Sequence, residues 1–266
     1  RRRVIAVAPP RPPRHARGMR GLVLLSLLVA CASAADRVGA DPAQPGAVPA
    51  FDRAAVRVRQ SLDPADAASP AAAKLLARVA QVEASQVDST YQARTAVDVR
   101  RGVYRWDCSG MTTWLLKRSA PRALAALASS RPVARDYYRA IARAPVARPR
   151  RGWQRLAHVR DARPGDLFAF LRSPISTSKI TGHVGVIVGW PTAIPDWPGA
   201  WAVRIADSTR GGHGDDLRAG DVDGGFGVGT MLFVTDAAGV VTHYGWIGLD
   251  SPWLMPTTVL FGRVAG

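Results

Sequence analysis

The spacing of apolar residues changes near residue 166, from a helical period to a strand period. Before this point apolar residues recur every three or four positions, which predicts amphipathic helices. These helices are expected over 71–85, from Met111 through Leu116, over 122–129 and over 133–143. After this point short runs rich in β-branched and aromatic residues predict strands. The strands are expected over 166–171, 184–188, 202–206, 231–235, 240–246 and 259–264.

The order of these elements predicts the fold class and the extent of the domain. Helices come first and strands follow, two of them joined by a hairpin turn at 236–239. This order favours an α+β fold in which helices pack on a mainly antiparallel β-sheet. A helix start at Ser69-Pro70 and the position of all Trp at or beyond Trp106 place the compact domain at 70–266. Residues 35–69 are rich in Ala, Asp, Pro and Gly, which predicts a tether.

The amino-terminal region has the layout of an export signal. Residues 1–18 show no apolar periodicity and precede the first Met, so we interpret them as an upstream artefact. Residues 19–34 combine one positive charge with an apolar run that is too short to span a bilayer, which predicts a signal peptide.

The end of this run, Leu28-Val29-Ala30-Cys31, resembles the lipobox of bacterial lipoproteins, in which the Cys carries the lipid. We expect lipidation of Cys31 because Cys is rare in this chain. Ordinary cleavage after Ala34 is the alternative. The first case predicts a periplasmic or cell-envelope lipoprotein attached to the membrane only through Cys31, and the second a secreted protein.

Composition and charge exclude several classes of protein. With 47% hydrophobic and 21% charged residues, the 266-residue chain is typical of a globular protein. The net charge is +16, but residues 1–30 hold seven Arg and no acidic residue, so 29 basic and 20 acidic residues remain, or +9. These charges are spread along the chain and accompany no nucleic-acid-binding module, so we expect no nucleic-acid partner. Attraction to an anionic cell-wall or membrane polymer stays open, and the oligomeric state is unknown.

Three residues have the types needed for a cysteine hydrolase. Cys108 lies in Asp107-Cys108-Ser109-Gly110, where an extended segment leads into a helix, and a helix amino terminus favours the thiolate. His183 begins a strand, and Asp207 ends another. A thiol, an imidazole and a carboxylate can act as nucleophile, base and orienting group. We expect Asp107, Ser109, Gly110 and Gly182 to lie beside the oxyanion or substrate.

The order Asp-Cys-Ser-Gly, Pro-Gly-Asp-Leu at 164–167 and Gly-His-Val-Gly-Val-Ile-Val at 182–188 resembles the NlpC/P60 cysteine peptidases over about residues 90–210. The resemblance implies a papain-like α+β fold and hydrolysis of amide bonds in peptidoglycan stem peptides, without a cofactor. It also implies that Cys108 is the nucleophile, His183 the base and Asp207 the third polar residue. The third residue of the family is more often His, Asn or Gln, and residues 121–150 are extra.

Two other functions remain open. A transglutaminase-like cysteine protease shares the order Cys, His, Asp, and Ala206-Asp207-Ser208-Thr209 resembles its Asp segment. A non-catalytic cell-wall-binding lipoprotein on the same scaffold is the other alternative.

Acidic and glycine-rich segments after residue 212 are weaker candidates. His213, Asp215 and Asp216 are candidate metal ligands, but without a recognisable zinc motif we expect no metal. Residues 221–224 begin like a calcium loop, but Leu232 stands where the closing Glu belongs. The glycines at 224–229 predict a turn.

Overall fold

The computed structural model of this protein describes residues 46–216, 218 and 224–266. The proposed upstream artefact, the signal peptide with Cys31, the first part of the predicted tether and residues 221–223 of the possible calcium loop lie outside the described residues.

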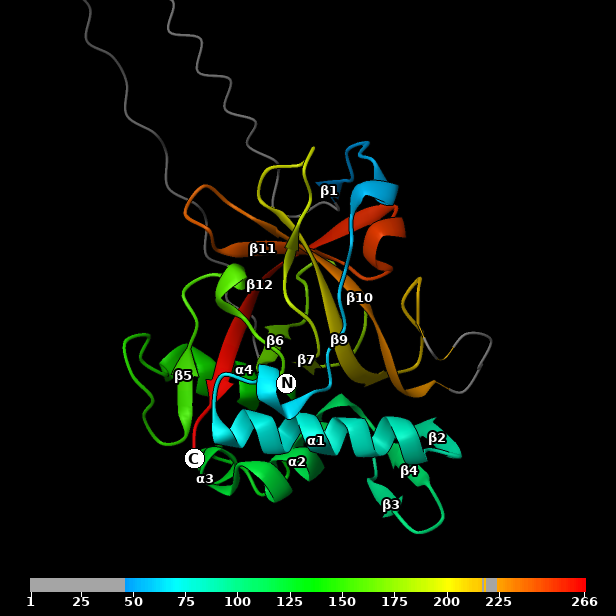
Figure 1. Cartoon of the computed structure of the whole chain (residues 1–266), viewed down its shortest axis with the longest axis vertical. Coiled ribbons are helices and arrows are strands. Elements are labelled where there is room, and N and C mark those ends of the chain that lie inside the picture. Colours follow the sequence, from blue (N-terminus) through cyan, green and yellow to red (C-terminus); the bar gives the residue numbers. More distant parts are fainter. Residues whose placement is uncertain (1–45, 217, 219–223) are drawn as a thin grey trace, which may run out of the picture. The chain divides into compact units, whose positions relative to one another are not determined.

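Six antiparallel strands form a closed barrel (Figure 1). They are β6 (Leu167–Leu171), β7 (Gly182–Ile187), β9 (Ala200–Thr209), β10 (Gly225–Thr235), β11 (Val241–Gly245) and β12 (Trp253–Val264). Neighbours pair in the order β12-β11-β10-β9-β7-β6, and β12 pairs again with β6 to close the ring. The prediction of an α+β, papain-like fold with helices packed on a sheet was therefore wrong, because the described chain is mostly β-structure and its main sheet is a closed barrel.

The length of β12 explains the error. Its first half pairs with β11, where Met255 lies opposite Tyr244, and its second half pairs with β6, where Phe261 lies opposite Phe168. The sequence pattern predicts a strand only from residue 259, so the half that reaches β11 was not expected. Local periodicity identifies strands but not the pairing between the first and the last of them.

Shorter strands extend the barrel or lie beside it. β1 (Gly46–Ala47) and β5 (Trp153–Arg155) pair with β12, and β8 (Thr192–Ala193) pairs with β9. A separate sheet contains β2 (Asp88–Tyr91), β4 (Val103–Trp106) and β3 (Ala96–Asp98), in that order. Part of the predicted tether lies against the barrel, because β1 pairs with β12 and the Val56 side chain is buried.

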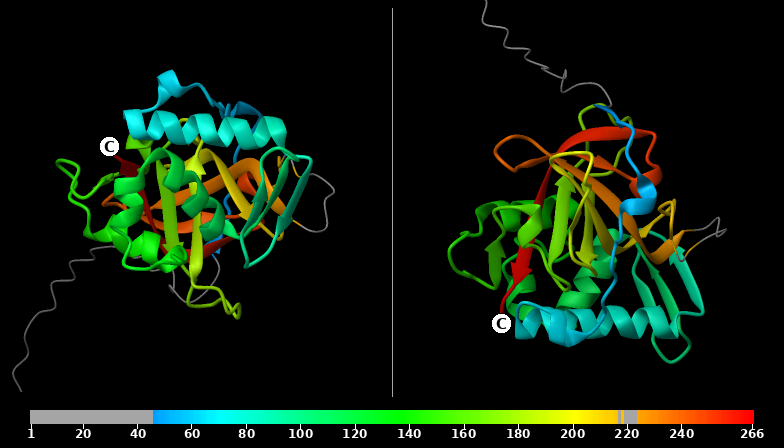
Figure 2. Two further views of the ribbon diagram at one scale, coloured as in Figure 1. Left: turned by 90° about the horizontal axis from the view of Figure 1, so that it is seen from below. Right: turned by 45° about the horizontal axis from the view of Figure 1, so that its top comes forward.

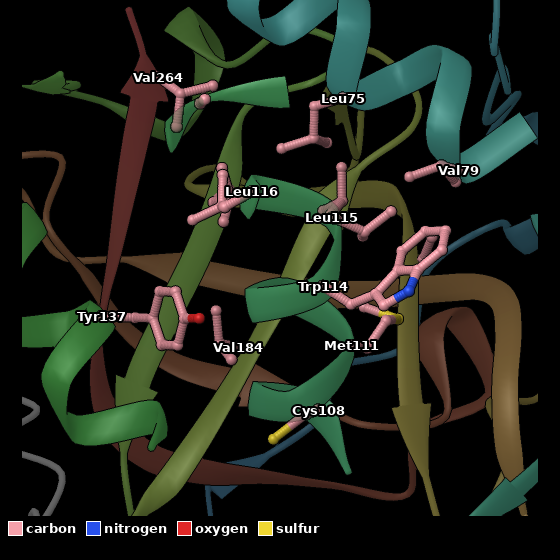
Figure 3. Packing of buried hydrophobic residues seen from close by; sticks show 14 of the residues in the cluster. Leu75, Val79, Cys108, Met111, Trp114, Leu115, Leu116, Tyr137, Val184 and Val264 are labelled. Carbon is pink, nitrogen blue, oxygen red and sulfur yellow. The ribbon is translucent and has the colours of Figure 1, made fainter. Parts of the chain in front are cut away.

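The described residues contain four α-helices, which lie together on one side of the barrel (Figures 1 and 2). They are α1 (Pro70–Ser85), α2 (Cys108–Ser119), α3 (Pro121–Ala125) and α4 (Ala134–Arg143). The start of α1 follows the sequence closely, since the Ser69 hydroxyl accepts a hydrogen bond from the Ala72 N–H at 3.0 Å and Pro70 occupies the first turn. Figure 3 shows apolar side chains of α1, α2 and α4 meeting between the helices and the strands.

Alternation along the strands separates two cores. In β6, Leu167 and Ala169 belong to the core beneath the helices, whereas Phe168 and Phe170 belong to the core inside the barrel. The same alternation places His183 of β7 on the interior face, where its ring lies 5.7 Å from the ring of Phe168. Asp207 shares a face of β9 with Ile205, which also packs inside the barrel. The side chains of His183 and Asp207 therefore both lie on the inner face of the barrel.

Candidate active site

Cys108 is positioned by the cap of α2, which confirms the prediction that it begins a helix. The Asp107 carboxylate caps this helix and accepts hydrogen bonds from the Gly110 N–H at 2.6 Å and the Ser109 hydroxyl at 2.8 Å. A side chain at Gly110 would collide with the Thr95 hydroxyl. The cap thus fixes the residue at which the helix starts, and with it the place of the sulfur.

The Cys108 thiol is a buried, neutral group. Its sulfur points from the first turn of α2 toward the strand that carries Val184 (Figure 3). Burial, and to a smaller extent the Asp107 carboxylate, raise the pKa of the thiol to about 12, although the backbone of Val184 and Ser109 acts to lower it. The thiolate expected from the helix amino terminus is therefore not the form that this arrangement favours.

His183 and Asp207 lie on neighbouring strands and are hydrogen-bonded, as the sequence predicted. β7 and β9 pair with Val186 opposite Ala206, and the His183 Nε2 atom lies 2.8 Å from the Asp207 Oδ2 atom. Gly182 precedes the histidine with a φ of +140°, and any side chain there would collide with the Phe170 carbonyl oxygen. This glycine therefore allows β7 to start beside β6 and bring His183 into place.

Asp207 has two further partners that the sequence did not predict. The His213 Nε2 atom lies 3.1 Å from the same Oδ2 atom, and the Arg218 guanidinium donates to Oδ1 at 2.9 Å. Burial alone would raise the pKa of the Asp207 carboxyl, but His213 and His183 together hold it well below its usual range. Asp207 is therefore an ionised, buried carboxylate.

Cys108 and His183 line one cleft of about 590 Å³, the thiol from the helix side and the imidazole from the barrel. Aromatic side chains form one part of its wall: Tyr91, Phe170, Tyr244 and Trp246. Lys179 and Arg210 add two cationic groups. Such a cleft suits a ligand with apolar parts and a negative charge. Among the described residues, no hydrogen bond joins the thiol to the His183 ring, and the Nδ1 atom of that ring has no partner.

The remaining predicted site residues divide between two places. Gly182 lines the cleft with Cys108. Asp107, Ser109 and Gly110 are absent from that lining and border a second cavity beside α2. The helix cap, rather than substrate contact, accounts for these three residues in the structure.

The acidic segment after β9 has a different role from the one considered in the sequence. Asp215 pairs with Arg204 at 2.7 Å and does not contact the groups around Asp207. Asp216 binds Arg218, which also binds Asp207, so these residues form one charge cluster with His213. Within the described ranges, no three His, Cys, Asp or Glu side chains are grouped as metal ligands. The predicted turn at 224–229 is largely wrong, because Gly225, Gly227 and Gly229 lie within β10.

Sequence reasoning missed Arg218 and Trp246 at this site. The Trp246 ring lies 5.2 Å from the His183 ring and 4.6 Å from the His213 ring, so it covers both imidazoles. The sequence held two signals for the groups around Asp207. One is the Gly-Val-Gly segment at 227–229, which leaves space on one face of a strand, and the other is the short distance along the chain between Asp207 and His213.

Comparisons with protein-family models, curated proteins and solved structures found no match to this chain. In the part of the chain that the structure describes, every helix is too short or too polar to cross a membrane.

Proposed function

We propose that this protein is a cysteine hydrolase that cleaves amide bonds, with peptidoglycan stem peptides as its substrates. The observation that carries the proposal is the shared cleft. It is lined by the Cys108 thiol and by His183, which is hydrogen-bonded to the buried carboxylate of Asp207. These three groups supply the nucleophile, the base and the residue that orients the base. The NlpC/P60-like order of motifs supports the same assignment independently of the fold.

The hydrogen bond between Nε2 of His183 and Asp207 sets the direction of proton transfer. It leaves Nδ1 to accept the thiol proton as the sulfur attacks the substrate carbonyl carbon. The new C–S bond places negative charge on the carbonyl oxygen, and the N–H of Cys108, which has no carbonyl partner within its own helix, can donate to it. His183 then donates its proton to the leaving amine, and a water molecule that it deprotonates hydrolyses the thioester.

The lining of the cleft supports an acidic peptide as substrate. Lys179 and Arg210 can bind carboxylates, while the aromatic wall can pack against the aliphatic parts of a peptide. Export and lipidation of Cys31 remain part of the proposal, because they would place the enzyme in the compartment that holds peptidoglycan.

One observation favours a second candidate function. A thiol that is buried and neutral is a weak nucleophile, as expected if the protein binds the cell wall without cleaving it. In that case the cleft would hold the same peptides, and Cys108 would be a packing residue.

Digestion of purified peptidoglycan separates the two functions. Mass spectrometry of the released fragments should show new free amines and carboxylates with the wild-type protein. The Cys108→Ala and His183→Ala variants should release none, and Asp207→Asn should release little, because it also unpairs His213 and Arg218. His243→Gln, on β11 and away from the cleft lining, is the matched control and should retain full activity.

Sedimentation of the same variants with insoluble peptidoglycan completes the experiment. Binding without cleavage by the wild type would favour the wall-binding function. Cleavage that persists in Cys108→Ala would contradict the cysteine-hydrolase proposal.

A further inference from the structure

We propose that His213 is a positioning residue, protonated at rest, which together with Arg218 neutralises Asp207 and thereby keeps Cys108 and His183 as a neutral thiol and a neutral imidazole. This inference deepens the proposed function and rests on it. It distinguishes the site from one that holds a thiolate–imidazolium pair before substrate binds.

The protonation of His213 follows from its two hydrogen-bond partners. Its Nδ1 atom lies 2.7 Å from the Trp246 carbonyl oxygen, which can only accept, so Nδ1 carries a proton. Its Nε2 atom lies 3.1 Å from Oδ2 of the ionised Asp207, which also only accepts. Both ring nitrogens are therefore protonated, and the fully buried ring is a cation. The Asp207 carboxylate accordingly raises the pKa of His213, against the effect of burial.

The charges of the cluster balance without a contribution from His183. Asp207 and Asp216 supply two negative charges, and His213 and Arg218 supply two positive ones. Arg218 joins the two carboxylates, since it donates to Asp216 at 2.9 Å through Nε and to Asp207 at 2.9 Å through a terminal nitrogen. A protonated His183 would add a third cation next to Asp207, which already has two.

The barrel is built to admit this cluster. Gly227 of β10 lies opposite Asp207, and a side chain there would collide with the Arg218 guanidinium. A Cβ atom at Gly229 would lie 2.6 Å from the Cβ of His213. Two positions on one face of a central strand are thus left empty to make room for the two cations.

The other charged and titratable groups near the Cys108–His183 pair do not restore an ion pair. Those facing it from the surrounding elements are Tyr91 of β2, Asp107 at the start of α2, Lys179 before β7, Arg210 after β9 and Tyr244 of β11. Asp107 disfavours the thiolate but favours the imidazolium, whereas Lys179 and Arg210 do the reverse, so none of them favours both members of an ion pair. The proton is therefore expected to pass from sulfur to Nδ1 only as the sulfur attacks the substrate.

Alkylation of Cys108 by iodoacetamide tests the inference without any substrate. The rate is measured against pH by mass spectrometry of the tryptic peptide 106–117, which contains Cys108 and excludes Cys31. The alkylation rate of the wild type should be low near neutral pH and should increase as the pH rises. It should reach no constant value at acidic pH.

Replacing His213 removes one positive charge from the cluster. His213→Gln should increase the labelling rate near pH 7 at least about tenfold, because His183 can then be protonated beside Asp207 and its positive charge stabilises the Cys108 thiolate, an interaction of more than about one pKa unit. The increase should shrink at alkaline pH, whereas a site that had merely loosened would react faster at every pH. His243→Gln should match the wild type. An unchanged His213→Gln profile, or an equal increase at all pH values, would overturn the inference.

Nitrogen NMR of the wild-type histidines gives a reading that does not depend on the folding of any variant. His213 should show two protonated ring nitrogens through neutral pH, and His183 a single proton on Nε2. A neutral His213, or a doubly protonated His183 at neutral pH, would overturn the inference. If these signatures are found but peptidoglycan stays intact in the digestion assay, the proposed function fails while the charge arrangement stands.

Discussion

Asp207 shows how much of the site depends on single side chains. Three donors, from His183, His213 and Arg218, bind its two oxygens, and the Asp207 side chain is fully buried. Removing one partner from a buried charge cluster typically costs about 3–5 kcal/mol, because the remaining charge is left without compensation. The residues that orient His183 are therefore also residues that stabilise the barrel.

The raised pKa of His213 predicts a pH-dependent contribution to stability. A histidine whose pKa is higher in the folded than in the unfolded state stabilises the fold fully below about pH 6.5, the unfolded value. The contribution is lost as the pH rises through the folded value. We therefore expect His213→Gln to lower the free energy of unfolding by about 3 kcal/mol near pH 6 and by less in alkaline solution.

Denaturant unfolding of wild type and His213→Gln across this pH range measures the difference. His243→Gln serves as the control, because burial lowers the pKa of His243 and the opposite pH dependence follows. A His213→Gln difference that is constant with pH, or that grows in alkaline solution, would contradict the assigned protonation.

At the scale of elements, the start of α2 decides the position and the state of the thiol. Its cap residue, Asp107, does two separable things: it accepts the Gly110 N–H, and its charge raises the pKa of Cys108. The cap fixes where the helix begins. The charge acts on the sulfur of the next residue, Cys108, and needs no hydrogen bond.

Two substitutions separate these effects. Asp107→Asn keeps a capping oxygen and removes the charge, so stability should stay near wild type while Cys108 alkylation becomes faster at neutral pH. Asp107→Ala removes both and should also lower the free energy of unfolding by about 1 kcal/mol. Thermal unfolding and labelling rates measure the two outcomes. Equal loss of stability in both variants, or unchanged labelling in both, would contradict this division of roles.

Local pattern predicted the elements better than their assembly. The helical period predicted α1 and α2 and the strand period predicted β6 and β7, since each signal lies within a few neighbouring residues. The small sheet of β2, β3 and β4 was not expected, because its strands are short and partly exposed. The full length of β10 was hidden by its glycines, which are typical of turns but here leave space for side chains.

At the scale of the whole molecule, closure of the barrel depends on contacts between distant parts of the sequence. The motif residue Asp166, just before β6, accepts two hydrogen bonds from Arg263 of β12, at 3.0 and 2.8 Å. This pair lies at the seam where the last strand meets β6. The Pro-Gly-Asp-Leu motif at 164–167 therefore has a structural role that its sequence did not reveal, because Arg263 lies 97 positions away.

The candidate site was predicted in part for the same reason. Cys108 and His183 stand at the starts of α2 and β7, and Asp207 follows the apolar run of β9, so the local sequence indicates the placement of each side chain. His213 and Arg218 follow β9 in a loop without periodicity, and only the folded barrel brings them to Asp207. The buried, neutral state of the thiol also depends on packing between the helices and the barrel, which no local pattern contains.

The central claim, covalent catalysis by Cys108, is tested most directly by the mass of the tryptic peptide 106–117 after a rapidly quenched reaction with a stem peptide. The account predicts that this peptide gains the mass of the acyl part of the substrate, that the adduct decays as product appears, and that Cys108→Ala shows neither adduct nor product. Product formation while this peptide stays unmodified, or an acyl adduct on another residue, would contradict it.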